Sequence, residues 1–209
     1  TFMKAPNGKS TNLNEAQWID VRTKRFKDWF GDWENDAKNA SKVVDENGEP
    51  LVVYHGTQSK FTEFKKRTSY GSGDSSLYLG QGFYFSNDYD TSDSYSNYEG
   101  NVIEAFLNLK NPFISDKWEH TSPIRQGSFA KDLGVKLGDE TSFLKSNNYD
   151  GVISKASDDY TEYNAYSSNQ IKSATANVGT YSASSNDIRF SINSTTPLSV
   201  KEQTEVIND

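Results

Sequence analysis

The chain has 209 residues, of which 33% are hydrophobic and 13% aromatic, and a formal net charge of −7. Its length fits one domain, or one domain with an appendage, and the negative charge argues against a surface that follows nucleic-acid phosphates. The absence of cysteine excludes disulfides, thiol chemistry and cysteine-ligated zinc. With only two histidines, we expect no metal site. No apolar run approaches the roughly 20 residues that span a bilayer, so we expect no membrane association.

The first predicted element is an aromatic helical segment near the N-terminus. Asn14 is a suitable N-cap residue, and Gln17 stands at the capping-box position. Large apolar residues then recur at near-helical spacing: Trp18, Val21, Phe26, Trp29, Phe30 and Trp33. Gly31-Asp32 predicts a break, and a second short helix is expected over about 33–40. This stripe favours packing against the rest of the chain, with a partner or substrate surface as the alternative. We therefore expect residues 1–41 to form an N-terminal helical extension.

A series of short strands is predicted after this segment. Asn47-Gly48 between β-branched runs predicts a hairpin whose second strand ends at His55. Residues 58–79 have the composition of a long loop. The remaining patterns predict strands at 83–86, 101–109, 149–153, 162–166 and near 176–180, and helices at about 88–97, 129–133 and 140–146. Such an order favours an α+β domain with two packed sheets over residues 42–190. Ile188 is expected to dock on this domain, and residues 191–209 to form a flexible C-terminal tail.

Three stretches place polar residues where strands would point them into a shared cleft. They are Tyr54-His55-Gly56-Thr57, Gly80-Gln81-Gly82-Phe83-Tyr84-Phe85-Ser86 and Thr161-Glu162-Tyr163. Each residue taken alone fits a structural role. The sequence contains no Rossmann glycine motif, no nucleophile elbow and no Walker loop. The three stretches are therefore the best candidates for a small-molecule site.

In this order the three stretches resemble the motifs of ADP-ribosyltransferases of the His-Tyr-Glu class, which includes diphtheria toxin and the poly(ADP-ribose) polymerases. The chain looks most like the ADP-ribosyltransferase domains of polyvalent proteins of phages and bacterial mobile elements. Ser92 and Tyr95 fall where the polymerases place a nicotinamide-amide serine and a second stacking tyrosine. Asn169-Gln170-Ile171 is similar to the turn that follows the glutamate strand. The resemblance implies an ADP-ribosyltransferase-like split two-sheet core with flanking helices.

The resemblance also implies NAD+ as co-substrate, with no metal, and a role for each matched residue. Glu162 would bond the nicotinamide ribose and stabilise an oxocarbenium-like transition state. Gly56 would let the backbone approach the nicotinamide amide closely. The predicted catalytic residues are Glu162, His55 and Tyr84. The predicted NAD+-binding residues are His55 on the adenosine-side ribose, Gly56 on the amide with Thr57 next in sequence, Tyr84 and Tyr95 around the nicotinamide ring, and Ser92 on the carboxamide. The loop at 58–79 would be a lid.

The acceptor is constrained by two departures from related enzymes. Arginine-specific members use Glu-x-Glu, whereas the residue two before Glu162 is Tyr160; this argues against arginine, although Asp158 and Asp159 lie close by. Nothing resembles the helical regulatory domain of the chain-elongating polymerases, which favours transfer of a single ADP-ribose. We therefore expect a monomeric mono-ADP-ribosyltransferase acting on a protein, with an effector or toxin-like role, either secreted or delivered into a target cell, or else cytoplasmic. The alternatives are an NAD glycohydrolase, a nucleic-acid ADP-ribosyltransferase, and a catalytically inactive NAD-binding module.

Overall fold

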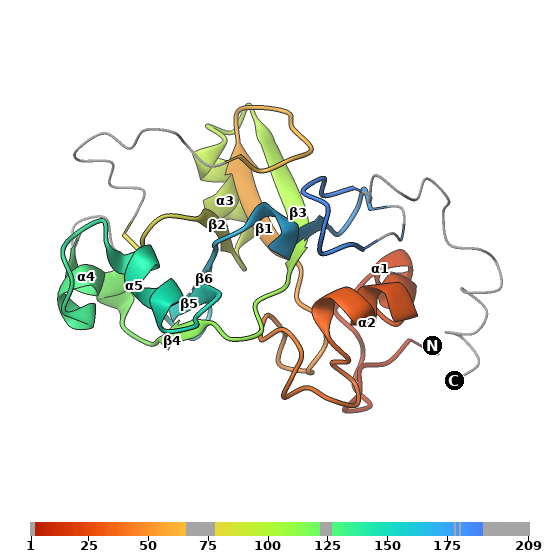
Figure 1. Cartoon of the computed structure of the whole chain (residues 1–209). Coiled ribbons are helices and arrows are strands. Elements are labelled where there is room, and N and C mark those ends of the chain that lie inside the picture. Colours follow the sequence, from red (N-terminus) through yellow and green to blue (C-terminus); the bar gives the residue numbers. More distant parts are fainter. Residues whose placement is uncertain (1–2, 66–77, 122–126, 178, 180, 190–209) are drawn as a thin grey trace.

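The computed structural model describes residues 3–65, 78–121, 127–177, 179 and 181–189 (Figure 1). Residues 66–77 of the predicted lid and the predicted tail at 191–209 lie outside the described residues. The helices are α1 (Glu15–Asp20), α2 (Lys24–Phe30), α3 (Tyr89–Tyr95), α4 (Ser128–Leu133) and α5 (Glu140–Ser146), with 3-10 turns η2 (Trp118–Thr121) and η4 (Ser168–Gln170). The strands are β1 (Val53–Thr57), β2 (Phe83–Ser86), β3 (Asn101–Leu107), β4 (Phe113–Ser115), β5 (Gly151–Lys155), β6 (Thr161–Ala165) and β7 (Ile171–Ser173).

The strands form one hydrogen-bonded sheet in the order β4-β5-β6-β2-β1-β3-β7. Only β4 and β5 run parallel; the other neighbours are antiparallel. The α+β class and the divided core are confirmed, although the described strands are hydrogen-bonded into one sheet and not two. β1 pairs with β3 along its whole length, and β2 pairs with β6 along its whole length. By contrast, β1 and β2 share the single register pair Tyr54↔Ser86. The sheet therefore consists of two halves that diverge beyond this one pair.

Helices α1 and α2 pack on the β1-β3-β7 half, at the opposite end of the molecule from α4 and α5 (Figure 1). The predicted capping box of Asn14 and Gln17 is present, and Thr23 caps a separate second helix. The ring of Phe26 lies 5.2 Å from Phe106 on β3 and 4.8 Å from Tyr181. Because the rings of the aromatic stripe are buried in this cluster, the helices brace the sheet.

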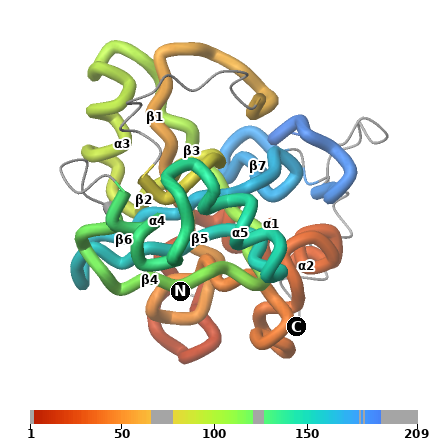
Figure 2. The backbone as a smooth tube through the Cα atoms, turned by 60° about the vertical axis from the view of Figure 1, so that its left-hand side comes forward, coloured from red at the N-terminus to blue at the C-terminus, as the bar shows by residue number. Residues whose placement is uncertain are grey.

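The other half of the sheet is covered by α4 and α5, which lie in front of it in Figure 2. Phe129 of α4 and Leu144 of α5 are buried with Val152 of β5. Both helices begin and end within one or two residues of the predicted bounds. Ile188 is buried in the central core, as expected, and its N–H donates to the Thr62 carbonyl oxygen at 2.8 Å.

Two expected elements are wrong. Residues 33–40 form turns, because the carboxylates of Asp32 and Asp36 accept from the nearby side-chain amides of Asn35 and Asn39 and so favour local turns over a helix. The last strand is Ile171–Ser173, where the chain pairs with β3, and not near 176–180; residues 178 and 180 lie outside the described residues. The Asn47-Gly48 turn does form, with Gly48 at φ +83°. The residues on either side of this turn make only an isolated bridge, Val44↔Pro50, and no continuous strand pair.

Candidate active site

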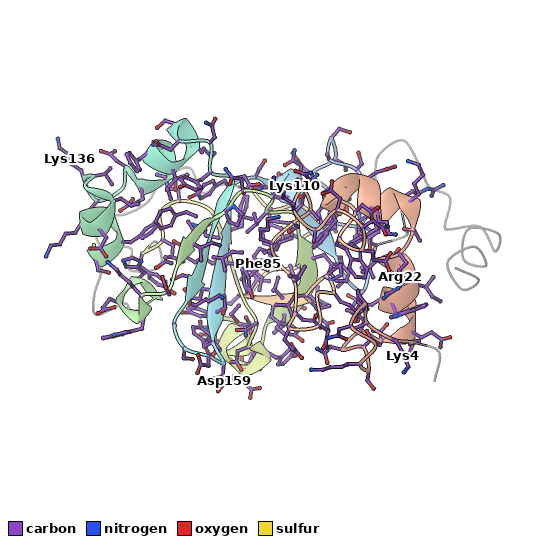
Figure 3. The ribbon with its side chains drawn as sticks, turned by 90° about the horizontal axis from the view of Figure 1, so that it is seen from below. Lys4, Arg22, Phe85, Lys110, Lys136 and Asp159 are labelled. Carbon is purple, nitrogen blue, oxygen red and sulfur yellow. The ribbon has the colours of Figure 1, made fainter. Side chains whose placement is uncertain are left out.

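A cavity of about 980 Å³ opens where the two halves of the sheet diverge. Its volume lies in the range of ligand-binding pockets. Phe85, labelled near the centre of Figure 3, is one of its wall residues. The cavity is also lined by every residue that the sequence predicts for the site: His55, Gly56, Thr57, Tyr84, Ser92, Tyr95 and Glu162. The fold thus brings together side chains from β1, β2, α3 and β6.

His55 bridges the two strands at the point where they diverge. Its Nδ1 lies 2.7 Å from the carbonyl oxygen of Tyr84. Since a carbonyl only accepts, Nδ1 carries the proton, and Nε2 of the neutral ring is an acceptor. The imidazole lies against the rings of Phe64 and Phe85, with centroid distances of 4.9 and 5.3 Å. Burial lowers the pKa of His55, so the ring is neutral at physiological pH. A neutral acceptor here suits a ligand hydroxyl.

Gly56 is required by the packing of α3 on β1. A Cβ at this position would lie 1.7 Å from the Ser92 carbonyl oxygen, a distance no side chain can adopt. The sequence predicts instead that this glycine exposes its backbone to the ligand, and that role stays a prediction. The neighbouring Thr57 hydroxyl accepts from the N–H of Ser59 at 3.2 Å, so it shapes the start of the following loop.

Tyr84 is held by its hydroxyl in a turn that precedes its own strand. The hydroxyl donates to the Gly80 carbonyl at 2.6 Å and accepts from the Leu79 N–H at 3.0 Å. The same turn is tied to β6, because the side-chain amide of Asn164 donates to the Leu79 carbonyl at 3.0 Å. Gly80 has φ +83°, which favours glycine in this turn. The tyrosine ring is therefore fixed on the wall of the cavity from two strands.

Ser92 and Tyr95 lie on α3, which flanks the cavity. The Ser92 hydroxyl is buried, donates to the Tyr54 carbonyl at 3.0 Å and lies 3.0 Å from the Ser86 hydroxyl. In this state it links α3 to β1 and β2. Tyr95 is 56% exposed at the C-terminal end of the helix. Its ring is thus accessible for stacking, as the resemblance implies.

Glu162 lies on β6 with only 4% of its surface exposed. Its Oε1 accepts from the hydroxyls of Tyr78 at 2.9 Å and Tyr160 at 2.6 Å. Its Oε2 is buried and has no hydrogen-bond partner among the described residues. Burial raises the pKa of Glu162, and the donors Tyr160 and Tyr78 act against this shift by stabilising the carboxylate. Leaving a buried carboxylate oxygen unpaired is unfavourable, so a ligand that donates a hydrogen bond to Oε2 would be stabilised here.

The sequence patterns assign no function to Tyr78, Tyr160 or Asn164. Tyr160 carried a usable signal, because alternation along a strand places residues 160 and 162 on one face. Tyr78 and Asn164 carried none, since their contacts join segments far apart in the chain.

A second group of polar side chains lies outside the cavity. The buried His120 has Nδ1 2.6 Å from the Ser115 hydroxyl and Nε2 2.9 Å from an Asp132 carboxylate oxygen, which also pairs with Lys117. Ser115 is only 3% exposed, so this group ties η2 to β4 and α4.

Across the described ranges, no cluster of three or more histidine, aspartate or glutamate side chains could hold a metal ion, and no helix is long and apolar enough to cross a membrane.

The divided sheet, with the histidine on one half and the tyrosine and glutamate on the other, agrees with the ADP-ribosyltransferase class indicated by the three motifs. The family model described as ADP-ribosyltransferase in polyvalent proteins matches residues 45–181, and the chain belongs to this family. No curated protein matches the chain. Helices α1 and α2 lie outside the matched range although they pack on it.

Proposed function

We propose that the chain is a mono-ADP-ribosyltransferase that cleaves NAD+ at the nicotinamide–ribose bond and transfers a single ADP-ribose to a protein. The observation that supports this most directly is Oε2 of Glu162, which lies in the wall of a large cavity and has no hydrogen-bond partner in the part of the chain that the structure describes. A ribose hydroxyl would donate to this oxygen and satisfy it.

The residues present fit a dinucleotide. The cavity of about 980 Å³ is large enough, and its acceptor atoms lie on both halves of the sheet: His55 Nε2 on β1 and Glu162 Oε2 on β6. The rings of Tyr84 and Tyr95 supply flat apolar surface for the nicotinamide. One ribose would bond His55 and the other Glu162.

Glu162 would stabilise the transition state more than bound NAD+. As the glycosidic bond lengthens, its electron pair moves to the nicotinamide nitrogen and positive charge develops on the ribose. A carboxylate in a site shielded from water interacts with that charge more strongly than it would in water. The acceptor nucleophile then attacks the anomeric carbon.

The net charge of the chain favours a protein over a nucleic acid as the acceptor. It is −7, which disfavours binding to a phosphate backbone. An effector or toxin-like role in phages or mobile elements is part of this proposal, because the family is defined on polyvalent proteins.

Incubation with NAD+ labelled in the adenylate moiety tests the proposal. The wild-type chain should release nicotinamide and transfer label to protein in a lysate or to itself, while Glu162→Gln should do both about 10²–10³-fold more slowly. Glu15→Gln, an exposed glutamate on α1, is the matched control and should behave as wild type. Release without transfer would indicate a glycohydrolase, and nuclease-sensitive label a nucleic-acid acceptor. Absence of release from the wild type would leave an inactive NAD-binding module.

A further inference from the structure

We propose that Tyr160 relays the acceptor's proton to Glu162, and that the acceptor group is a hydroxyl. This inference rests on the proposed function and specifies its acceptor side. It starts from the short hydrogen bond of 2.6 Å between the Tyr160 hydroxyl and Glu162 Oε1, in the wall of the cavity.

The direction of that hydrogen bond determines what Tyr160 can bind next. A phenol has one proton, and here it is donated to a carboxylate, which only accepts. The oxygen of Tyr160 therefore presents lone pairs to the cavity. Its next partner has to be a donor, such as the O–H of an acceptor. Burial and the negative charge of Glu162 both raise the pKa of Tyr160, so the phenol keeps its proton at neutral pH.

The backbone around Tyr160 is fixed by a tight turn between β5 and β6. The Ala156 N–H donates to the Tyr160 carbonyl at 2.9 Å, and the Tyr160 N–H donates to the Ser157 hydroxyl at 3.1 Å. On the other side, the Asn87 side-chain amide donates to the Asp159 carbonyl at 3.0 Å. Figure 3 shows Asp159 at the outer tip of this hairpin, next to α3. The phenol is thus held in place before any acceptor arrives.

The charges around Glu162 favour a neutral acceptor over a guanidinium. Among the described residues that line the cavity, the acidic side chains are Glu162 and Glu63. Glu63 lies on the loop after β1 and faces Lys65, at 3.9 Å. The described residues that hydrogen-bond to the Glu162 carboxylate are tyrosines, so within the described part of the chain a cationic acceptor would find no second carboxylate beside it. A hydroxyl acceptor needs a route for its proton, and the relay supplies one.

Atoms and charges balance in the transfer of ADP-ribose to the hydroxyl acceptor. The acceptor oxygen bonds to the anomeric carbon while the carbon–nitrogen bond to nicotinamide breaks and its electron pair stays on the nicotinamide nitrogen. The acceptor's proton moves to the Tyr160 oxygen, and the Tyr160 proton moves to Glu162 Oε1. The pyridinium charge and the carboxylate charge both disappear, leaving neutral nicotinamide and a neutral Glu162.

Tyr78 provides a matched control because it donates to the same Oε1 at 2.9 Å. It is 6% exposed and its ring packs edge-on to Tyr84, with centroids 5.7 Å apart. Tyr78→Phe removes a donor from Glu162, as Tyr160→Phe does. If the two tyrosines only hold the carboxylate, the variants should behave alike.

The test uses the whole chain with NAD+, methanol as hydroxyl probe and agmatine as guanidinium probe. Products are identified by mass spectrometry, nicotinamide release is followed from pH 5 to 10, and NAD+ affinity is measured by calorimetry. The wild type should form methyl-ADP-ribose and no agmatine adduct. Tyr160→Phe should bind NAD+ within about twofold of wild type but form methyl-ADP-ribose at least about tenfold more slowly, which is a conservative loss for a proton-transfer group. The rate of Tyr160→Phe should keep rising with pH as hydroxide replaces the relay. The rate of Tyr78→Phe, whatever its level, should become independent of pH in the same range as the wild-type rate.

Equal losses in the two variants, a wild-type rate in Tyr160→Phe, or agmatine as the preferred acceptor would overturn the relay while leaving the transferase intact. Absence of nicotinamide release from the wild type would overturn the proposed function, and the relay with it.

Discussion

Replacing Gly56 by alanine should disrupt the site through the backbone of α3. The new Cβ would lie 1.7 Å from the Ser92 carbonyl oxygen and 3.1 Å from the Ser96 nitrogen. An ordinary contact is about 3.4 Å or more, so α3 would have to move by roughly 1.7 Å. Overpacking of this kind costs about 1–3 kcal/mol of unfolding free energy. In a chain of this size that corresponds to a melting temperature lower by roughly 2–12 °C.

The displacement should also reach the ligand, because α3 carries Ser92 and Tyr95 into the cavity. We expect Gly56→Ala to bind NAD+ at least about tenfold more weakly, which corresponds to about 1.4 kcal/mol. Calorimetry and urea unfolding measure the two effects. Gly134→Ala is the control: it has φ +71° but nothing within 4 Å of a Cβ, so it should lose about 1 kcal/mol of stability and no affinity. Wild-type affinity in Gly56→Ala would refute the reasoning.

Three further predictions concern stability and the support of the site. Burial raises the pKa of Asp20 to about 6 from 3.8, so its contribution to stability is present below pH 4 and is lost by pH 7, a change on the order of 3 kcal/mol. Urea unfolding of Asp20→Asn should lack this pH dependence, and an unchanged slope would contradict the assignment. Phe26→Ala should lower the unfolding free energy by about 3–5 kcal/mol and Phe143→Ala, at 37% exposed, by less than about 1; equal losses would mean that α2 is not a brace. Asn164→Ala should free the Leu79–Gly80 turn and weaken NAD+ binding in calorimetry, and retained affinity would show that this turn does not position Tyr84.

The sequence predicted elements whose causes are local. The capping box at Asn14 depends on contacts within four residues, and α5 depends on a short amphipathic pattern that ends in a turn. The break between α1 and α2 was missed because Val21 and Phe26 keep a near-helical spacing across it, while Thr23 caps the second helix. The final strand was misplaced because its position depends on pairing with β3, which no local pattern reveals.

The sequence predicts which residues form the candidate site, but not the hydrogen bonds that hold their side chains in place. The order of His55, Tyr84 and Glu162 carried the resemblance, and the structure places all three in one cavity. Their supports depend on long-range contacts, such as the bond from Tyr78 to Glu162 across 84 positions of sequence. A further constraint on Gly56 could not be predicted, because it comes from the backbone of α3. Contacts of this kind follow from the tertiary fold.

The catalytic effect of the negative charge on Glu162 can be measured from the rate of nicotinamide release by Glu162→Gln. The substitution keeps the shape of the side chain and its ability to accept from Tyr78 and Tyr160, but removes the negative charge. We predict NAD+ affinity within about threefold of wild type and release slower by about 10²–10³-fold, the usual effect of losing one electrostatic group from a transition state. Release at the wild-type rate would contradict this role, because the charge on Glu162 would then not stabilise the transition state for cleavage of the nicotinamide–ribose bond.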